Sequence, residues 1–571
     1  MTDPAKLTSL AGESEKIDRS LAALDRDRVV PRIWQRDSSL WKEDGETRKK
    51  IDNRLGWLTS VETLQGRLSE LIAYRDAVVR SGVTDVVLAG MGGSSLCPEV
   101  CRKIFGSASG YPALHVLDTT KPSTILRVDR KLDPRTTLYL IASKSGSTLE
   151  VDSLYRYFFQ QAERRIPGNP GSRFVAITDP GTELEKLAGE KGFSKIFANP
   201  PDIGGRFSAL SFFGLVPAAL IGIDLKRFLG RAAEMAEACR KDSPVDRNPG
   251  AYLGAVLASL GKSGRNKVTL IMPRPMNGFG IWLEQLLAES TGKEGMGLVP
   301  VEGEEAGSPG DYSNDRLFLY YRMASEPDPE LDRKIERIGQ SGQPVLAISV
   351  PDRYQLPGEM FRWEFATAVA GADWKINPFD EPNVKESKDN TQRLLDGFIR
   401  SGKLPDSGRA PEENRIDLSM DSDAGISGSL AGKIDLFLKT KPSGRYVAIL
   451  AYLDASEEID ALLQRIRMVI RNHYRFATTV GYGPRFLHST GQLHKGGKEE
   501  GVFIQITDEA PEDLAIPGRS FSFGVLNRSQ SLGDLEALGR RGLPLLQIHL
   551  GRSAADGLKA IASQLERTFK R

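Results

Sequence analysis

The chain holds 571 residues, and its 77 lysines and arginines nearly balance its 75 aspartates and glutamates, which gives a formal net charge of +2. A balanced charge without a long basic run argues against nucleic acid and against a membrane surface as partners. The three cysteines lack the spacing of a disulfide framework or a metal site, and no apolar stretch is long enough to cross a bilayer, so we expect a cytoplasmic protein. The length predicts two or three domains.

Residues 1–82 are expected to form a helical N-terminal segment, because they contain no strand-like run. Trp34, Trp41 and Trp57 supply aromatic side chains with which such a segment can pack. We therefore expect a bracing element rather than part of a sheet.

Residues 83–250 alternate between apolar strands and stretches of helix length. The strands are expected at 85–89, 114–117, 137–142, 174–177 and 195–198. Strands separated in this way form βαβ units, so the pattern predicts a parallel sheet.

Residues 251–401 repeat the alternation, with strands expected at 267–272, 317–321 and 345–350. Residues 402–432 are rich in Asp, Ser, Gly, Pro and Glu, which predicts a linker or a long surface excursion. Residues 433–571 resume the α/β pattern, with strands expected at 446–452, 478–480, 501–507 and 545–550. The predicted fold class is α/β, with two doubly wound parallel-sheet domains and a C-terminal α/β extension.

The most informative motif follows the strand expected at 137–142. It consists of Ser143, Lys144, Ser145, Gly146, Ser147 and Thr148. Open α/β sheets bind ligands at the carboxyl ends of their strands. Hydroxyl donors, one positive charge and a glycine that allows close backbone approach together favour a phosphate. The alternative is an ordinary polar turn that caps a helix.

A second polar turn, Gly-Met-Gly-Gly-Ser-Ser at 90–95, follows the strand at 85–89 in the same way. It places Gly93 and Ser94 at the opening of a helix, which strengthens the case for a phosphate site. A dinucleotide fingerprint would need a third glycine where Ser95 stands, so nucleotide binding is the second choice.

Three further polar side chains are candidates for proton transfer and charge stabilisation. Gln285 and Glu289 lie four residues apart, which places them on one face of a predicted helix, where a carboxylate base and an amide could orient a substrate hydroxyl. Arg206 follows two glycines and precedes an apolar helix, so it is suited to face developing negative charge. The plain alternatives are a solvated glutamate and a surface arginine at a helix start.

Two of the five histidines are candidates for acid or base chemistry. His115 and His549 lie inside apolar strand patterns, and His473 ends a predicted helix, where its charge suits the helix dipole. His488 and His494 lie in a turn-rich segment, and an imidazole there can exchange protons near neutral pH.

Taken in order, these motifs resemble the glucose-6-phosphate isomerase family. The matching stretches are Gly-Gly-Ser at 92–94, Ser-Lys-Ser-Gly-Ser-Thr at 143–148, Gly-Gly-Arg-Phe-Ser at 204–208, and Gln285 with Glu289-Ser. The chain looks most like the isomerase half of bacterial transaldolase/glucose-6-phosphate isomerase fusion proteins, which share Arg-Ile-Trp at 32–34 and Leu-His-Ser-Thr-Gly-Gln-Leu-His-Lys-Gly-Gly at 487–497. The resemblance covers essentially the whole chain, without a transaldolase barrel.

The resemblance implies two sugar-isomerase (SIS-type) domains, no metal or other cofactor, and reversible conversion of glucose 6-phosphate into fructose 6-phosphate through ring opening and a cis-enediolate. Gly93, Ser94 and residues 143–148 would hold the sugar phosphate, and Gln285 would help to position the sugar. Glu289 would move the proton between C2 and C1, while Arg206 would stabilise the enediolate.

The resemblance assigns ring opening to a histidine and a lysine. The family's lysine motif, Phe-Asp-Gln-x-Gly-Val-Glu-x-x-Lys, has its counterpart at 379–388, where Glu381, Asn383 and Lys385 depart from it and Lys388 is the candidate. His488 begins a His-x-x-x-Gln-Leu segment like the family's, although in other members the histidine precedes the lysine. We therefore expect the C-terminal region to bring His488 to a site built by the two earlier domains.

Two other functions stay open at this point. The chain could isomerise mannose 6-phosphate as well, or it could bind a sugar phosphate without turnover, as a sensor or as a structural partner of a transaldolase. The family resemblance also suggests a homodimer and a functional link to a transaldolase.

Overall fold

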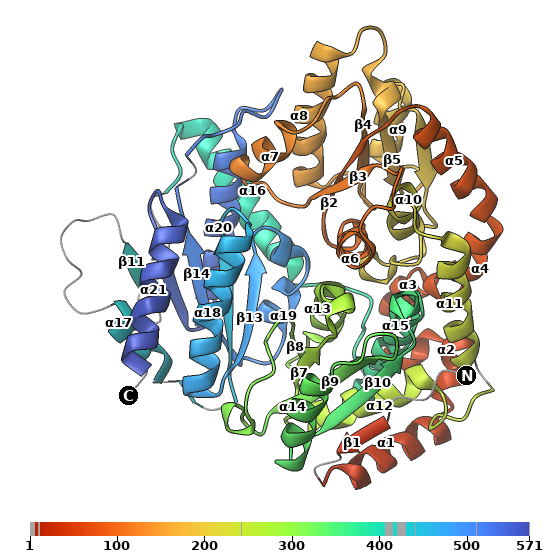
Figure 1. The fold of residues 1–571 in the computed structure, drawn as a ribbon, viewed down its shortest axis with the longest axis vertical. Helices are drawn as coiled ribbons and strands as arrows, with labels where there is room; N and C mark the ends of the chain where they lie inside the picture. Colours follow the sequence, from red (N-terminus) through yellow and green to blue (C-terminus); the bar gives the residue numbers. More distant parts are fainter. Residues whose placement is uncertain are drawn as a thin grey trace.

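The computed structural model describes residues 6–9, 12–240, 242–405, 415–419, 430–439, 441–442, 444–509 and 511–569. It contains three five-stranded sheets, each surrounded by helices (Figure 1). This confirms the predicted α/β class with parallel sheets. Leaving aside one edge strand in the second sheet and one in the third, the first strand of each unit lies between the second and the third, which is a doubly wound order.

The N-terminal helices pack into the same apolar core as the first two sheets. Trp34 and Trp57 contact Phe361 and Phe365 of helix α15, and Trp41 contacts Phe379 edge to face. The helices are α1 (Ser14–Arg26), α2 (Val29–Trp34), α3 (Gly45–Asp52), α4 (Trp57–Gly66) and α5 (Leu68–Arg80).

Strand β1 (Lys6–Ser9) differs from the prediction, which placed no strand in the N-terminal segment. It pairs antiparallel with β10 (Val345–Val350) at the edge of the second sheet. Its four residues, Lys-Leu-Thr-Ser, carry no apolar run, so an edge strand of this kind leaves little trace in the sequence.

The first sheet has the order β3-β2-β4-β5-β6, and all its neighbours are parallel. Its strands are β2 (Asp85–Gly90), β3 (Ala113–Leu117), β4 (Thr137–Ala142), β5 (Phe174–Thr178) and β6 (Lys195–Ala198). Its helices are α6 (Leu96–Phe105), α7 (Pro122–Asp129), α8 (Leu149–Arg165), α9 (Glu183–Glu190), α10 (Phe212–Leu220) and α11 (Leu225–Ala238). Both predicted phosphate turns leave the carboxyl ends of the adjacent strands β2 and β4, which is where the winding direction changes.

The second sheet has the order β1-β10-β9-β7-β8. Its other strands are β7 (Lys267–Ile271), β8 (Val299–Val301) and β9 (Arg316–Met323), and its helices are α12 (Pro249–Lys262), α13 (Phe279–Thr291), α14 (Pro329–Gln340), α15 (Leu356–Trp374) and α16 (Val384–Ser401). Gln285 and Glu289 lie on α13, near its C-terminal end, rather than at the carboxyl edge of this sheet.

The third sheet has the order β11-β15-β14-β12-β13, and all its neighbours are parallel. Its strands are β11 (Arg415–Ser419), β12 (Tyr446–Tyr452), β13 (Ala477–Tyr482), β14 (Gly501–Thr507) and β15 (Leu545–His549). Its helices are α17 (Leu430–Lys439), α18 (Glu457–Tyr474), α19 (Gly491–Gly496), α20 (Phe523–Gly539) and α21 (Ala554–Phe569).

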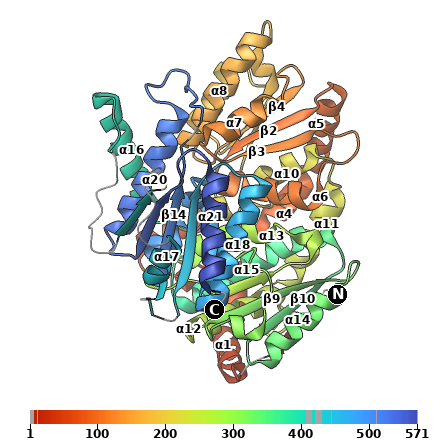
Figure 2. The ribbon, with the colours of Figure 1, turned by 60° about the vertical axis from the view of Figure 1, so that its left-hand side comes forward.

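Strand β11 falls inside the segment predicted as a linker, so this segment adds a strand to the third sheet. Residues 406–414 and 420–429 of the predicted linker lie outside the described residues. Helix α16 belongs by sequence to the second unit, but it lies along α20 of the third unit (Figure 2). The last helix before the predicted linker therefore packs on the C-terminal region.

One inner strand of each sheet, β4, β7 or β12, is buried over its whole length. Such strands face helices on both sides, which is why they are continuous apolar runs in the sequence. None of the described helices is long and apolar enough to span a membrane.

Candidate active site

The hydroxyl-rich turn after β4 is held by its own side chains. The Ser143 hydroxyl lies 3.0 Å from that of Thr148 and accepts a hydrogen bond from the Gly146 amide at 3.1 Å. Gly146 has a φ of +69°, and a β-carbon there would lie 2.7 Å from the side chain of Thr182. The turn therefore requires glycine at this position, and it leaves the hydroxyls of Ser145 and Ser147 exposed.

The Lys144 side chain points away from these hydroxyls, toward the loops that carry Asp179 and Pro201. Its ammonium pairs with the Asp179 carboxylate and donates to the Pro201 carbonyl at 3.0 Å. Burial raises the pKa of Asp179 in spite of this lysine. The one positive charge of the motif is thus engaged by the neighbouring loop, and the open face of the turn offers neutral donors.

The turn of residues Gly92–Ser94 lies between the first sheet and α13. A β-carbon on Gly93 would stand 1.9 Å from the Gly205 carbonyl oxygen, so this backbone contact excludes any side chain. A β-carbon on Gly92 would lie 2.8 Å from the Gln285 amide nitrogen. Ser94 is buried at the end of the turn. Close approach, rather than turn conformation alone, explains the paired glycines.

Gln285 and Glu289 face the same point from one side of α13. The Gln285 amide donates to Glu289 Oε2 at 2.9 Å and to the His488 carbonyl at 2.8 Å. Glu289 is only 7% exposed. Burial raises the pKa of Glu289 above its ordinary value, the Arg206 guanidinium opposes this rise, and the Glu381 carboxylate adds to it. A buried carboxyl with a raised pKa is a stronger base once it is ionised.

Arg206 is fixed by neutral partners on two of its three nitrogens. Its Nε donates to the Ser290 hydroxyl at 2.7 Å, and its Nη2 donates to the carbonyls of Pro378 and Asp380 at 2.8 and 2.7 Å. The remaining nitrogen, Nη1, lies 3.5 Å from Glu289 Oε2. The cation therefore stands beside the candidate base in a preset orientation.

His488 reaches this place from the C-terminal region, in the short turn η9 (Arg485–His488). Its Nε2 lies 2.9 Å from Glu150 Oε1, and the same oxygen accepts a hydrogen bond from Gln530 at 2.8 Å. Burial would raise the pKa of Glu150, but the charges of His488 and Lys388 hold it below its ordinary value. An ionised carboxylate therefore orients the imidazole.

A cavity of about 310 Å³ joins the hydroxyl turn to the two ring-opening candidates, whereas Arg206, Gln285 and Glu289 do not line it. It is lined by the hydroxyl turn, by Lys388 and Ser387 of α16, by His488 and by Gln530. Lys388 is exposed toward it. His494, the alternative candidate, is buried elsewhere, and burial together with Lys495 holds its pKa well below the ordinary value.

Gln492, four residues after His488, joins the elements that carry the other candidates. Its side-chain oxygen accepts from the Asn383 amide at 2.8 Å, and its nitrogen donates to the Gly292 carbonyl at 2.9 Å. Gly292 follows α13 and Asn383 precedes α16, so one buried amide links the helices of Glu289 and Lys388 to the segment of His488.

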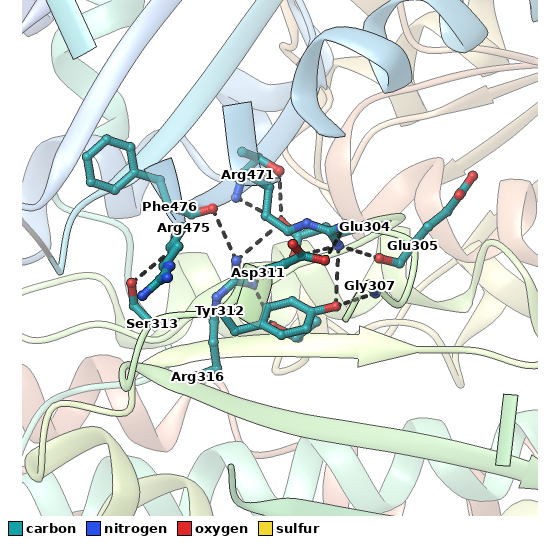
Figure 3. Close-up of polar contacts among 12 residues, drawn as sticks. Glu304, Glu305, Gly307, Asp311, Tyr312, Ser313, Arg316, Arg471, Arg475 and Phe476 are labelled. Atoms are coloured by element: carbon teal, nitrogen blue, oxygen red, sulfur yellow. Dashed lines mark hydrogen bonds and ion pairs between the residues drawn. The ribbon is translucent and has the colours of Figure 1, made fainter. Parts of the chain in front are cut away.

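A buried ionic network fixes the C-terminal region to the second sheet (Figure 3). Arg316 of β9 donates to Glu304 at 2.9 Å and to the Phe476 carbonyl at 3.1 Å. Glu304 also accepts from the Thr478 amide at 3.1 Å, and Arg471 donates to the Glu305 carbonyl. Figure 3 shows Arg316 and Arg471 converging on Glu304 from the two regions. The network thus includes the start of β13, the strand that leads to His488.

Glu150 is a site residue that the sequence analysis did not identify. It lies two residues after the hydroxyl turn, on the first turn of α8, and it is 6% exposed. The helix dipole favours a carboxylate in the first turn of any helix, so the position of Glu150 in the sequence did not mark it as a candidate for chemistry. None of the described residues forms a group of three or more His, Cys, Asp or Glu side chains that could hold a metal.

Comparison with known proteins identifies relatives that match more than half of the chain. The family model described as phosphoglucose isomerase matches residues 67–299, which include both turns, Arg206 and Glu289 but neither Lys388 nor His488. Glucose-6-phosphate isomerase of Thermus thermophilus is 29% identical over 383 residues, covering 60% of this chain and 90% of that protein. The enzyme of Rubrobacter xylanophilus is 30% identical over 378 residues, covering 56% and 84%. The crystal structure of a hypothetical protein from Thermus thermophilus has a TM-score of 0.59 at 28% identity, covering 68% of this chain and 99% of that one.

Proposed function

The chain belongs to the phosphoglucose isomerase family, and from this premise we propose that it interconverts glucose 6-phosphate and fructose 6-phosphate through a cis-enediolate. The observation that carries the proposal is the buried carboxyl of Glu289, held between the amide of Gln285 and the guanidinium of Arg206. The reaction needs one base and one cation at adjacent carbon atoms, and this arrangement supplies both.

The phosphate would bind at the open face of the hydroxyl turn. Ser145, Ser147 and Thr148 line the cavity and can donate to phosphate oxygens. The assignment of Gly93 and Ser94 to the same phosphate depends on the family resemblance. A phosphate held away from the reacting carbons fixes their position relative to Glu289, and that binding energy contributes to the rate. Lys144 would act at longer range, because Asp179 already neutralises it.

Glu289 would then move the proton. An aldose and its ketose share one enediol, so a single carboxylate can take a proton from C1 or C2 and return it to the other carbon. The raised pKa of Glu289 favours this uptake. Arg206 Nη1, beside the carboxylate, would stabilise the negative charge that develops on the enediolate oxygen.

His488 and Lys388 would open the hexose ring before proton transfer. The contact of His488 with the ionised Glu150 supports proton exchange with the ring oxygen or the anomeric hydroxyl. Lys388 lines the same cavity and can donate to the other of these oxygens. In the proposed arrangement both residues come from the same chain.

Three finer features of the proposal depend on family resemblance. We propose a cytoplasmic homodimer whose sugar phosphates are shared with a transaldolase. Size-exclusion chromatography with light scattering would test the dimer, and co-purification with the transaldolase of the same cell would test the link.

The test is incubation with fructose 6-phosphate in heavy water, comparing wild type with Glu289→Gln. We expect deuterium at C2 of the glucose 6-phosphate formed, and a loss of about 10²–10⁴ in kcat for the variant. The matched control is Glu284→Gln on the same helix, since burial raises the pKa of Glu284 to about 8 and the change removes little charge at neutral pH.

Undiminished turnover by Glu289→Gln would contradict the proposal, whereas product without deuterium at C2 would mean that the carboxylate returns the proton before it exchanges with the solvent. Binding of the sugar phosphate without any turnover by the wild type would indicate a non-catalytic binding protein. Turnover of mannose 6-phosphate at a comparable rate would extend the activity to the C2 epimer.

A further inference from the structure

A chain of buried hydrogen bonds leads from helix α20 of the C-terminal region to the imidazole of His488. The Asn527 amide donates to the Thr120 hydroxyl oxygen at 3.0 Å, and this hydroxyl donates to the Gln530 side-chain oxygen at 2.7 Å. The Gln530 nitrogen donates to Glu150 Oε1 at 2.8 Å, and His488 Nε2 lies 2.9 Å from the same oxygen. All four side chains that precede the imidazole are buried.

This chain fixes the orientation of the Gln530 amide. The Thr120 hydroxyl has one proton, and because its oxygen accepts from Asn527, that proton can point to Gln530. The carbonyl end of the amide therefore faces Thr120, and its NH₂ end faces Glu150. A flipped amide would set its oxygen against a carboxylate oxygen, so that two acceptors would face each other.

The carboxylate in turn determines which nitrogen of His488 carries a proton at this contact. Burial raises the pKa of Glu150, but the charges of His488 and Lys388 outweigh it, so the carboxyl is ionised and only accepts hydrogen bonds. His488 Nε2 is therefore protonated where it meets Glu150 Oε1. The second donor on this oxygen, Gln530, holds the carboxylate in the position from which it orients the imidazole.

Gln530 also lies where the proposed chemistry takes place. It lines the cavity of about 310 Å³ together with Glu150, His488 and Lys388. As a neutral donor, its amide adds a hydrogen bond to the carboxylate without adding a charge. A lysine or an arginine at the same place would compete with the imidazole for the negative charge of Glu150.

We propose that Gln530 is a positioning residue for the ring-opening step, which acts through Glu150 to hold His488 in its working orientation. The inference rests on the proposed function. In this arrangement the C-terminal region contributes both the imidazole and the amide that fixes its carboxylate partner, while the carboxylate itself belongs to α8 of the first unit.

The test compares the wild type with Gln530→Met, which keeps a similar volume and removes the amide. We expect kcat for glucose 6-phosphate to fall about tenfold, because a hydrogen bond to a charged group is lost, while KM changes less than about twofold. A four-carbon aldose phosphate, which forms no stable ring, should be isomerised at nearly the wild-type rate. Gln547→Met on β15, whose amide donates to Gln505 at 3.0 Å, is the matched control and should change neither rate.

A double-mutant cycle separates positioning through Glu150 from a general structural role. If Gln530 acts through Glu150, Gln530→Met should lower kcat no further when Glu150→Ala is already present. Thr120→Val gives a second variant in case Gln530→Met does not fold. It removes the hydroxyl that orients the Gln530 amide, and it should lower kcat for glucose 6-phosphate about threefold.

Four results would overturn this inference and leave the proposed function intact. They are an unchanged kcat of Gln530→Met, a raised KM at unchanged kcat, equal losses with the cyclic and the four-carbon substrate, and additive losses in the double-mutant cycle. Failure of the wild type to isomerise either substrate would instead contradict the proposed function itself.

Discussion

Apart from the edge strands β6 and β11, the first and third sheets have the same strand order, but the carboxyl ends of their strands have different surroundings. In the first sheet, the crevice between β2 and β4 opens onto the hydroxyl turn, where Ser145 and Ser147 are exposed. In the third sheet, the equivalent position between β12 and β14, which we call the closed edge, is occupied by residues of the first unit: Lys121 pairs with Asp508, and Arg127 donates to Asp454 at 2.6 Å. A cavity of about 560 Å³ lies beside this contact, lined among others by Arg127, Ser456 and Gly483. The same strand order thus carries the candidate phosphate turn in one sheet and a contact between two units in the other.

The largest effect on activity should come from His488, which the C-terminal region places beside the hydroxyl turn of the first sheet, the open edge. His488→Ala should lower kcat for the cyclic hexose phosphates by about 10²–10⁴, because ring opening loses its acid and base. A four-carbon aldose phosphate that forms no stable ring should be isomerised at nearly the wild-type rate. His473→Ala, on the exposed end of α18, is the control. Equal losses with both substrates would show that His488 has a structural role.

A substitution at the closed edge, where Lys121 pairs with Asp508, should lower the stability of the protein and leave its substrate affinity unchanged. Lys121 and Asp508 are both nearly buried, and removal of one partner of such a pair costs about 3–5 kcal/mol. Lys121→Met should therefore lower the free energy of unfolding in urea by about this amount, with KM unchanged. The double variant Lys121→Met/Asp508→Leu should recover much of the loss. A KM effect without a stability effect would contradict the assignment of this edge.

A substitution at the open edge should lower kcat/KM and phosphate binding and leave the stability of the protein almost unchanged. The Ser147 hydroxyl is exposed, and its contact is the neighbouring Ser145 hydroxyl at 3.3 Å, so Ser147→Ala should change stability by less than about 0.5 kcal/mol. Loss of one hydrogen bond to a charged phosphate should lower kcat/KM about tenfold. Inhibition by inorganic phosphate should weaken in parallel. If inhibition by phosphate were unaffected, the turn would not be the phosphate site.

The smallest effect is a shift in pH dependence. Burial and Glu381 raise the pKa of Glu289, and the base must be ionised to accept a proton. Activity should therefore be full above this pKa and fall as the pH drops through it, at a higher pH than an ordinary carboxyl would give. The acid limb of kcat/KM measures this value. Ser147→Ala should leave the limb in place, since the open edge lies away from the base.

The same contrast explains what could be predicted from the sequence. Central strands such as β4 and β12 were predictable because they are buried on both faces and appear as continuous apolar runs. Strands β1, β8 and β11 were missed, although the edge strands β3, β6 and β13 were predicted. Strand β8 has three residues with Pro300 at its centre, and β1 and β11 contain no continuous apolar run. Their positions depend on long-range pairing, which no local pattern encodes.

The site divides in a similar way. The two turns and the pair on α13 were found because their chemistry is local, with Gln285 and Glu289 one helical turn apart. Glu150 and Gln530 were missed because their roles arise from contacts across hundreds of residues. Lys144 belongs to the motif but not to its open face, since the fold provides Asp179 as its partner. The role of His488 is tested by the His488→Ala variant above, and that of Lys388 stays a prediction.

The place of His488 in the chain has a consequence during synthesis. Domains fold in order as a chain leaves the ribosome, so the first two sheets can form while the third is still being translated. At that stage Arg206, Glu289 and Lys388 are already present, but the imidazole and the Gln530 that supports Glu150 are not. A nascent chain would then lack part of the cavity wall as well as the candidate for ring opening, and catalysis would begin only when the last sheet has folded against the first.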